Sequence, residues 1–131
     1  MRQLNEATSD NFERALKTAL ANVKKSGQTP IYAVSLARAA AKPIERVYAK
    51  GTPRPSQLDT KIVPALMNII LGEFRKNLNH HKIRQGLGPY KNVWTDYMLT
   101  DFHIMYNICD DPAMVTILYI GDHANNPAYR F

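Results

Sequence analysis

Three β-favouring runs follow one another in the last third of this chain, and they limit its fold more than any other feature. The runs cover residues 91–99, 102–109 and 114–120, and each contains aromatic or β-branched side chains. Asp110-Asp111-Pro112 is a turn sequence that joins the last two runs as a hairpin, and Thr100-Asp101 joins the first two. These residues therefore predict three consecutive strands in one sheet.

The N-terminal part of the chain predicts one helix followed by one short strand. Apolar residues recur at helical spacing between residues 10 and 25, and Ser9-Asp10 can cap the first turn. Gly27 and Pro30 stop this helix. Residues 31–36 are mostly apolar and favour extended backbone, so we expect a strand there.

Two further helices are expected in the middle of the chain. The first covers residues 42–49 and is followed by a stiff proline-rich loop at residues 52–57. The second covers residues 58–77, and Pro64 is tolerated there if it falls in the first turn. Residues 80–86, which include two histidines and two basic residues, are expected to form a basic loop.

The order of these elements predicts the fold class. A helix, a strand, two helices and three consecutive strands indicate an α+β domain, with helices packed on one side of a mostly antiparallel sheet. A length of 131 residues suggests one such domain, and a hydrophobic content of 45% is sufficient for a core.

Charge and cysteine content restrict the kinds of partner and metal site that this chain can have. The net charge of +6 favours a polyanionic partner, either nucleic acid or an acidic protein. Cys109 is the single cysteine, which excludes an intrachain disulfide and a cysteine-based zinc site. The longest apolar runs, residues 62–70 and 114–120, are far shorter than a membrane span, and the N-terminus shows no apolar signal region. We expect a cytoplasmic protein without membrane association.

The end of the last predicted strand carries a histidine suited to acid–base chemistry. Gly121-Asp122-His123 follows residues 115–120 directly, so the glycine would release His123 from the strand end. In a basic protein the obvious target is a phosphodiester. Cleavage of RNA by its own 2′-hydroxyl needs a base, an acid and cations that stabilise the phosphorane. Histidine, carboxylate, arginine and lysine side chains do this without a metal.

Short motifs stand in a fixed order on the predicted elements. They are the loop His81–Gly86, the pair Tyr90-Lys91, the run Asp101–Tyr106 and the final Gly121-Asp122-His123. In this order they resemble the RelE/ParE superfamily of bacterial toxins, in particular the YafQ-type mRNA interferases. The resemblance covers about residues 31–125 and leaves the first helix outside it.

The resemblance implies a RelE-like fold with an extra N-terminal helix. We accordingly divide the chain into a helical extension, residues 1–29, and a toxin domain, residues 30–131. It also implies a metal-independent endoribonuclease, without cofactor, that cuts mRNA in the ribosomal A site and leaves a 2′,3′-cyclic phosphate and a 5′-hydroxyl. The implied partners are mRNA, the ribosome and a cognate acidic antitoxin, with operator DNA bound only through the antitoxin.

Four residues are candidates for catalysis. By the resemblance, His123 is the general acid, and Asp101 is a base or orients a histidine. His81 is a base or a phosphate ligand, with His80 as a competitor for this role. Asp96 is a further candidate base, but Asp96 and its neighbour Tyr97 alternate in direction on a strand, so only one of the two can face the site.

Four residues are candidates for RNA binding. Lys82, Arg84 and Lys91 cluster around the predicted loop and the start of the next strand, where they could hold the RNA backbone. Tyr97 could stack a base or donate to the phosphate. A solvated charged rim explains the three cations equally well.

Two other functions stay open on this scaffold. One is a ParE-like inhibitor of DNA gyrase, which the N-terminal helix keeps possible. The other is a basic RNA-binding or antitoxin-like module that has the fold without the chemistry. Activity that survives His123→Ala would favour either of them.

Overall fold

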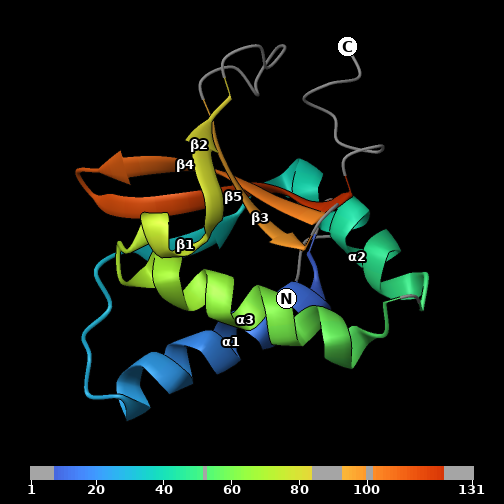
Figure 1. The fold of residues 1–131 in the computed structure, drawn as a ribbon, viewed down its shortest axis with the longest axis horizontal. Helices are drawn as coiled ribbons and strands as arrows, with labels where there is room; N and C mark the ends of the chain where they lie inside the picture. The colour runs from blue at the N-terminus through green and yellow to red at the C-terminus, as the bar shows by residue number, and fades with distance from the viewer. Residues whose placement is uncertain (1–7, 52, 84–92, 100–101, 123–131) are drawn as a thin grey trace, which may run out of the picture.

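Helices cover one face of a mixed five-stranded sheet in the computed structural model of this protein (Figure 1). The structure describes residues 8–51, 53–83, 93–99 and 102–122. The helical elements are α1 (Asp10–Lys25), η1 (Arg38–Ala40), α2 (Ala41–Ala49), α3 (Pro55–Ile70) and η2 (Phe74–Lys76). The strands are β1 (Ala33–Leu36), β2 (Leu78–Lys82), β3 (Trp94–Leu99), β4 (Phe102–Asp110) and β5 (Ala113–Asp122).

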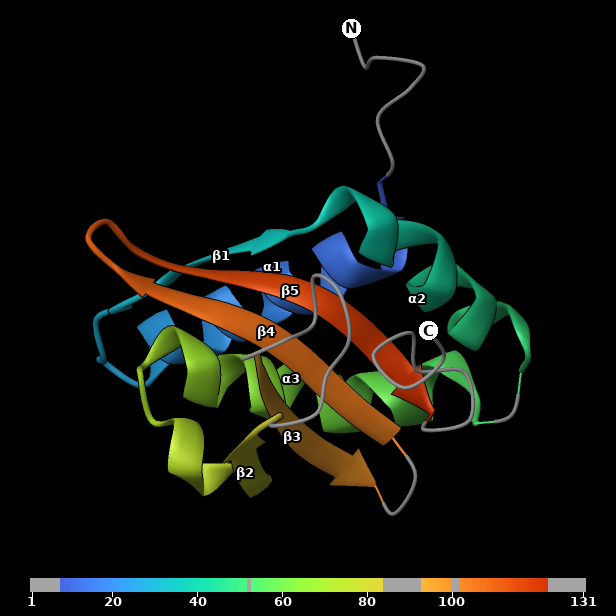
Figure 2. The same ribbon diagram turned by 90° about the horizontal axis from the view of Figure 1, so that it is seen from above.

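The sheet has the strand order β1-β5-β4-β3-β2. The last three strands form the predicted antiparallel meander, with Asp110 opposite Ala113 at the hairpin. β1 pairs with β5 in parallel, with Ala33 beside Met114. The α+β class and the mostly antiparallel sheet are therefore confirmed, and β5 lies between strands from opposite ends of the chain (Figure 2).

The first helix begins and ends where its sequence predicts. The Ser9 hydroxyl accepts a hydrogen bond from the Phe12 amide at 3.1 Å, which caps α1. Arg14 on the exposed side forms an ion pair with Asp59 of α3, with 2.9 Å between Nη2 and Oδ2. The apolar side of α1 contributes to the main core, and its buried residues are Phe12, Ala15, Ala19 and Val23.

The third helix corrects the prediction for residues 52–58. α3 begins at Pro55, not at Leu58, because a proline at the first helical position loses no hydrogen bond that the helix needs. The Gln57 side chain supports this start by accepting from the Arg54 amide at 3.1 Å. Pro64 consequently lies inside the helix rather than in its first turn. The helix ends at Ile70, where Gly72 adopts a positive φ of 71°.

The histidine pair lies on a strand and not in a loop. Residues 78–82 form β2, which pairs with β3 and is an edge of the sheet. The expected basic loop at residues 80–86 is therefore wrong for its first part. Despite a register shift between Leu78 and His81, the two rings lie on opposite faces, since His80 contacts Asp96 and His81 lies near Tyr97. This decides their separate roles below.

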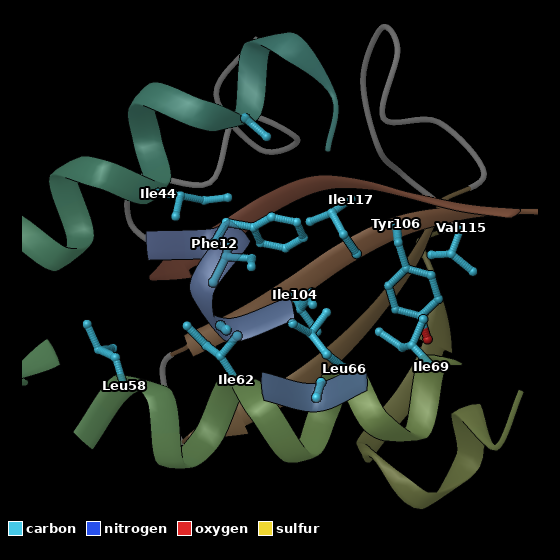
Figure 3. Packing of buried hydrophobic residues seen from close by; sticks show 14 of the residues in the cluster. Phe12, Ile44, Leu58, Ile62, Leu66, Ile69, Ile104, Tyr106, Val115 and Ile117 are labelled. Carbon is cyan, nitrogen blue, oxygen red and sulfur yellow. The ribbon is translucent and has the colours of Figure 1, made fainter. Parts of the chain in front are cut away.

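A single main core lies between the helices and the sheet. α1 and α3 pack side by side, and α2 packs over β5. Phe12 and Ile44 from the helices and Ile104 and Ile117 from the sheet belong to this core, and Figure 3 shows the Phe12 ring beside Ile117. None of the described helices is long and apolar enough to cross a membrane.

Candidate functional site

The two faces of the sheet carry different chemistry. The Asp96 carboxylate points to the helix side, where it accepts a hydrogen bond from Asn77, whereas the Tyr97 ring lies against His103 on the other side. We call this other side the far face. Its described residues include His81, Tyr97, His103, Met105 and Tyr119.

A row of rings crosses the far face from β2 to β4. The centroids of His81 and Tyr97 lie 6.3 Å apart, and those of Tyr97 and His103 lie 4.5 Å apart. Tyr97 and His103 are register partners, so the closer contact is a direct cross-strand pair. His81 is exposed, Tyr97 is half-buried and His103 is buried. This row places an imidazole and a phenol next to each other at an accessible position.

Gly121 extends this row onto β5. It pairs with His103, and the Tyr119 ring lies over it. A Cβ at position 121 would lie 2.5 Å from the Tyr119 hydroxyl oxygen and 2.7 Å from Cζ. The same hydroxyl donates to the Asp122 carbonyl at 2.8 Å. The sequence suggested that Gly121 ends the strand, but β5 continues through it to Asp122. The missing side chain of Gly121 makes room for the tyrosine ring.

The opposite, helix-side face holds a fully buried carboxylate. Asp96 Oδ2 accepts hydrogen bonds from Asn77 Nδ2 at 2.9 Å and from the Tyr106 hydroxyl at 2.6 Å. His80 Nδ1 lies 2.5 Å from Asp96 Oδ1. A buried carboxylate is tolerated only when donors surround it, and three side chains from η2–β2 and β4 do so here.

The Asn77 amide completes this network and holds its geometry. It donates to the Ala65 carbonyl of α3 at 3.2 Å as well as to Asp96, and its oxygen accepts from Asn68 at 2.8 Å. Both amide hydrogens of Asn77 are thus used. The network joins α3 to β3 through hydrogen bonds in addition to apolar packing.

The same network fixes the orientation of His80. A carboxylate only accepts, so His80 donates to Asp96 from a protonated Nδ1. Its ring stacks on Trp94 with centroids 4.5 Å apart and planes 7° apart, and it lies 5.9 Å from the Phe74 ring. Among the described residues, Nε2 of His80 has no hydrogen-bond partner.

Burial and this network also change the acidity of the Tyr106 hydroxyl. Desolvation, followed by the hydrogen bond to Asp96, raises the pKa of the Tyr106 hydroxyl far above the ordinary tyrosine value. The phenol therefore stays protonated and remains a donor to the carboxylate.

A hollow of about 400 Å³ opens beside His80 at the edge of the sheet. Arg75, Asn77, His80 and Trp94 line it. Lys82 places its ammonium 6.0 Å from the centre of the Trp94 ring. Within the described part of the chain, no three histidine, cysteine, aspartate or glutamate side chains come together as a metal site would require.

No protein-family model matches the sequence, and no curated protein matches it either. Solved structures, however, share its fold. A chain of the toxin–antitoxin complex RelBE2 from Mycobacterium tuberculosis has a TM-score of 0.50 and 14% identity, over 72% of this chain and 100% of that chain. YafQ from Escherichia coli has a TM-score of 0.50 and 13% identity, over 71% of this chain and 94% of that chain. This protein has a RelE-like fold.

The RelE-like sheet brings two of the predicted site residues together. His81 and Tyr97 meet on the far face, as described above. Asp96 lies on the helix side of the sheet and is fully buried, so it does not share a face with Tyr97. Lys82 is exposed on β2 beside Trp94.

The other four predicted site residues lie outside the described part of the RelE-like fold. They are Asp101, His123, Arg84 and Lys91. In the sequence, Asp101 directly precedes Phe102 and His123 directly follows Asp122, and Phe102 and Asp122 are register partners. Asp122 also lies 3.5 Å from the Lys50 ammonium.

Sequence reasoning missed the residues that surround Asp96. His80 was only a competitor of His81, and Asn77 was expected to end a helix. The available signal was the strand alternation of a His-His pair, which separates the two rings onto opposite faces once residues 78–82 are assigned to a strand. No sequence signal pairs Asn77 or Tyr106 with Asp96, because these residues are distant in the chain.

Proposed function

We propose that this protein is the toxin of a type II toxin–antitoxin system and acts as a metal-independent endoribonuclease on mRNA at the ribosome. The observation that carries the proposal is the RelE-like fold with His81 and Tyr97 side by side on the far face. The neighbours with this fold include a toxin from a toxin–antitoxin complex. The net charge of +6 suits an RNA target.

The proposed reaction uses one base, one acid and nearby cations. His81 or Asp101 takes the proton from the 2′-hydroxyl, and the resulting oxygen attacks the adjacent phosphorus. The bond from phosphorus to the 5′-oxygen breaks, and His123 protonates that oxygen. The products are a 2′,3′-cyclic phosphate and a 5′-hydroxyl. Tyr97 contacts the phosphate or a base.

Cations are proposed to stabilise the charge of the transition state. Arg84 and Lys91 are candidates because each is basic and stands next to β2 or β3 in the sequence. Lys82 is the third candidate; its ammonium lies beside Trp94 on the other side of the edge strand β2, where it would meet RNA that passes around this edge. A cognate acidic antitoxin would cover this surface, and operator DNA would be bound through the antitoxin. The site of action is the cytoplasm.

Inducible expression in bacteria tests the proposal, with primer extension on a reporter mRNA. We expect growth arrest and discrete new 5′ ends with the wild type, and loss of both with His123→Ala. His81→Ala should slow cleavage by about 10²–10⁴-fold, the usual contribution of general acid–base catalysis. Lys17→Ala, an exposed change on α1, is the control and should cleave like the wild type.

Other outcomes would identify another function. Growth arrest without RNA cleavage, unchanged in His123→Ala, would point to a ParE-like action on DNA gyrase. RNA binding without arrest or cleavage would indicate a non-catalytic RNA-binding module on the same fold.

A further inference from the structure

The hollow beside His80 lies on the opposite side of β2 from His81 and plays no part in the reaction proposed above. Its volume of about 400 Å³ is within the range of sites for small ligands or single nucleotides. Its lining combines a guanidinium, an imidazole and an indole, from Arg75, His80 and Trp94. Hydrophobic packing alone does not require these three groups at one opening.

Two of these groups are free to bind a ligand. Among the described residues, Arg75 has no ion-pair or hydrogen-bond partner, and it is exposed. His80 is held rigidly, because Asp96 takes Nδ1 and Trp94 stacks on its ring, and Nε2 is left for a ligand. Asn77 is committed to Ala65 and Asp96, so it shapes the wall and does not contribute a donor.

We propose that this hollow binds one nucleotide of a single-stranded RNA. Arg75 holds a phosphate with its planar fork of donors, His80 Nε2 makes a second polar contact, and the base packs against Trp94. The proposal rests on the proposed function, since it assigns a second contact for the RNA that the far face cleaves.

The position of β2 favours RNA over other ligands. β2 is an edge strand, so a flexible polymer can pass around it without crossing other strands. His80 and His81 are adjacent on β2 and point to opposite faces, so a strand bound at one face reaches the other after a short path. The Lys82 ammonium near Trp94 adds positive charge along that path.

Trp94 allows a direct test, because it is the single tryptophan of the chain. The purified full chain is titrated with a short 2′-O-methylated single-stranded RNA, which lacks the free 2′-hydroxyl that the proposed cleavage needs. We expect binding to change the Trp94 fluorescence. Arg75→Ala should weaken the binding by about tenfold, as expected for the loss of one charge-assisted contact.

Lys76→Ala is the matched control. It removes the same charge from the same short helix, but Lys76 is paired with Glu73 at 2.7 Å and is not among the residues lining the hollow. We expect a change below about twofold, from long-range electrostatics alone. Equal weakening by both variants would overturn the proposal, because it would show non-specific attraction.

Two further outcomes would also overturn the proposal. RNA binding without any change in Trp94 fluorescence would place the RNA elsewhere. A polyglutamate peptide that changes the fluorescence in an Arg75-dependent way, when RNA does not, would assign the hollow to an acidic protein partner. Failure of the proposed function is separate, since it would appear as intact mRNA while the Trp94 response to RNA persists.

Discussion

Asp96 illustrates how a single buried charge organises its surroundings. Three donors meet one carboxylate that is 0% exposed, and they come from residues 77, 80 and 106. Leaving any of these groups unpaired in the interior would cost more than the bond itself contributes. The network therefore selects one arrangement of β2 against β3 and β4, and so defines the hollow beside His80.

The raised pKa of Tyr106 predicts a stability change in alkali. The folded state keeps its phenol proton above the ordinary tyrosine pKa of 10.0, whereas the unfolded state loses it. The stabilisation by this group is therefore complete below pH 10 and falls as the pH rises further. In Tyr106→Phe the fall of the free energy of unfolding above about pH 10 should be shallower by about 1.4 kcal/mol per pH unit.

Urea unfolding at several pH values between neutrality and strong alkali measures this difference. At neutral pH the same variant should be less stable by about 1–3 kcal/mol, because Asp96 loses a buried donor. A variant whose alkaline slope equals that of the wild type would contradict the prediction.

Gly121 is expected to resist substitution for reasons of space. In Gly121→Ala the new methyl group would lie 2.5 Å from the Tyr119 hydroxyl oxygen and 2.7 Å from the ring carbon Cζ, so the tyrosine side chain or the strand must shift. We expect a loss of about 1–3 kcal/mol in the free energy of unfolding, which is typical of overpacking. Chemical denaturation measures it.

The matching control removes the Tyr119 ring. In a Tyr119→Ala background, Gly121→Ala should cost much less, because the ring that it would strike is absent. Equal costs in both backgrounds would show that position 121 needs glycine for some reason other than the ring.

Among the elements, those with regular patterns were predictable. α1, β1 and the three C-terminal strands follow from apolar spacing, a capping serine and short turns. α3 and β2 were not placed correctly, since proline and histidine give conflicting local signals. A proline inside a helix, such as Pro64, lowers the stability by about 3 kcal/mol. Burial of Leu58 and Ile62, which precede it in the same helix, outweighs this loss.

α1 contributes to stability as an integral element of the fold. The apolar side of the helix supplies Phe12 and Val23 to the main core, and Arg14 reaches Asp59 on α3. Each fully buried side chain of this size contributes about 1.5–3 kcal/mol, a large part of the usual net stability of about 5–15 kcal/mol. Deletion of residues 1–28 should therefore abolish cooperative unfolding.

Thermal unfolding by circular dichroism, with dye binding to exposed apolar surface, checks this expectation. Deletion of residues 1–7 alone is the control, since it keeps the Ser9 cap and all of α1. A cooperative transition near the wild-type midpoint after deletion of residues 1–28 would instead support a separate extension at residues 1–29.

For the whole molecule, the sequence predicted the α+β fold class and the order of the C-terminal strands better than the grouping of the candidate site residues. The residues suited to catalysis could be named from their chemistry, but their grouping depends on which face each strand turns to the helices. His80 and His81 differ by one position and reach different surroundings. Asp96 and Tyr97 separate in the same way. Such choices depend on register, and register is fixed by pairing between distant segments.

The parallel pairing of β1 with β5 has a consequence for the timing of folding during synthesis. The ribosome makes a chain from its N-terminus, and β5 is the last of the described strands to emerge. Until residues 113–122 exist, β1 has no partner in the described sheet, and α2 lacks the strand against which it packs. Nascent chains that stop earlier therefore lack the strand that brings Tyr119 and Gly121 to the far face, and any activity that needs the complete sheet begins only after β5 has left the ribosome.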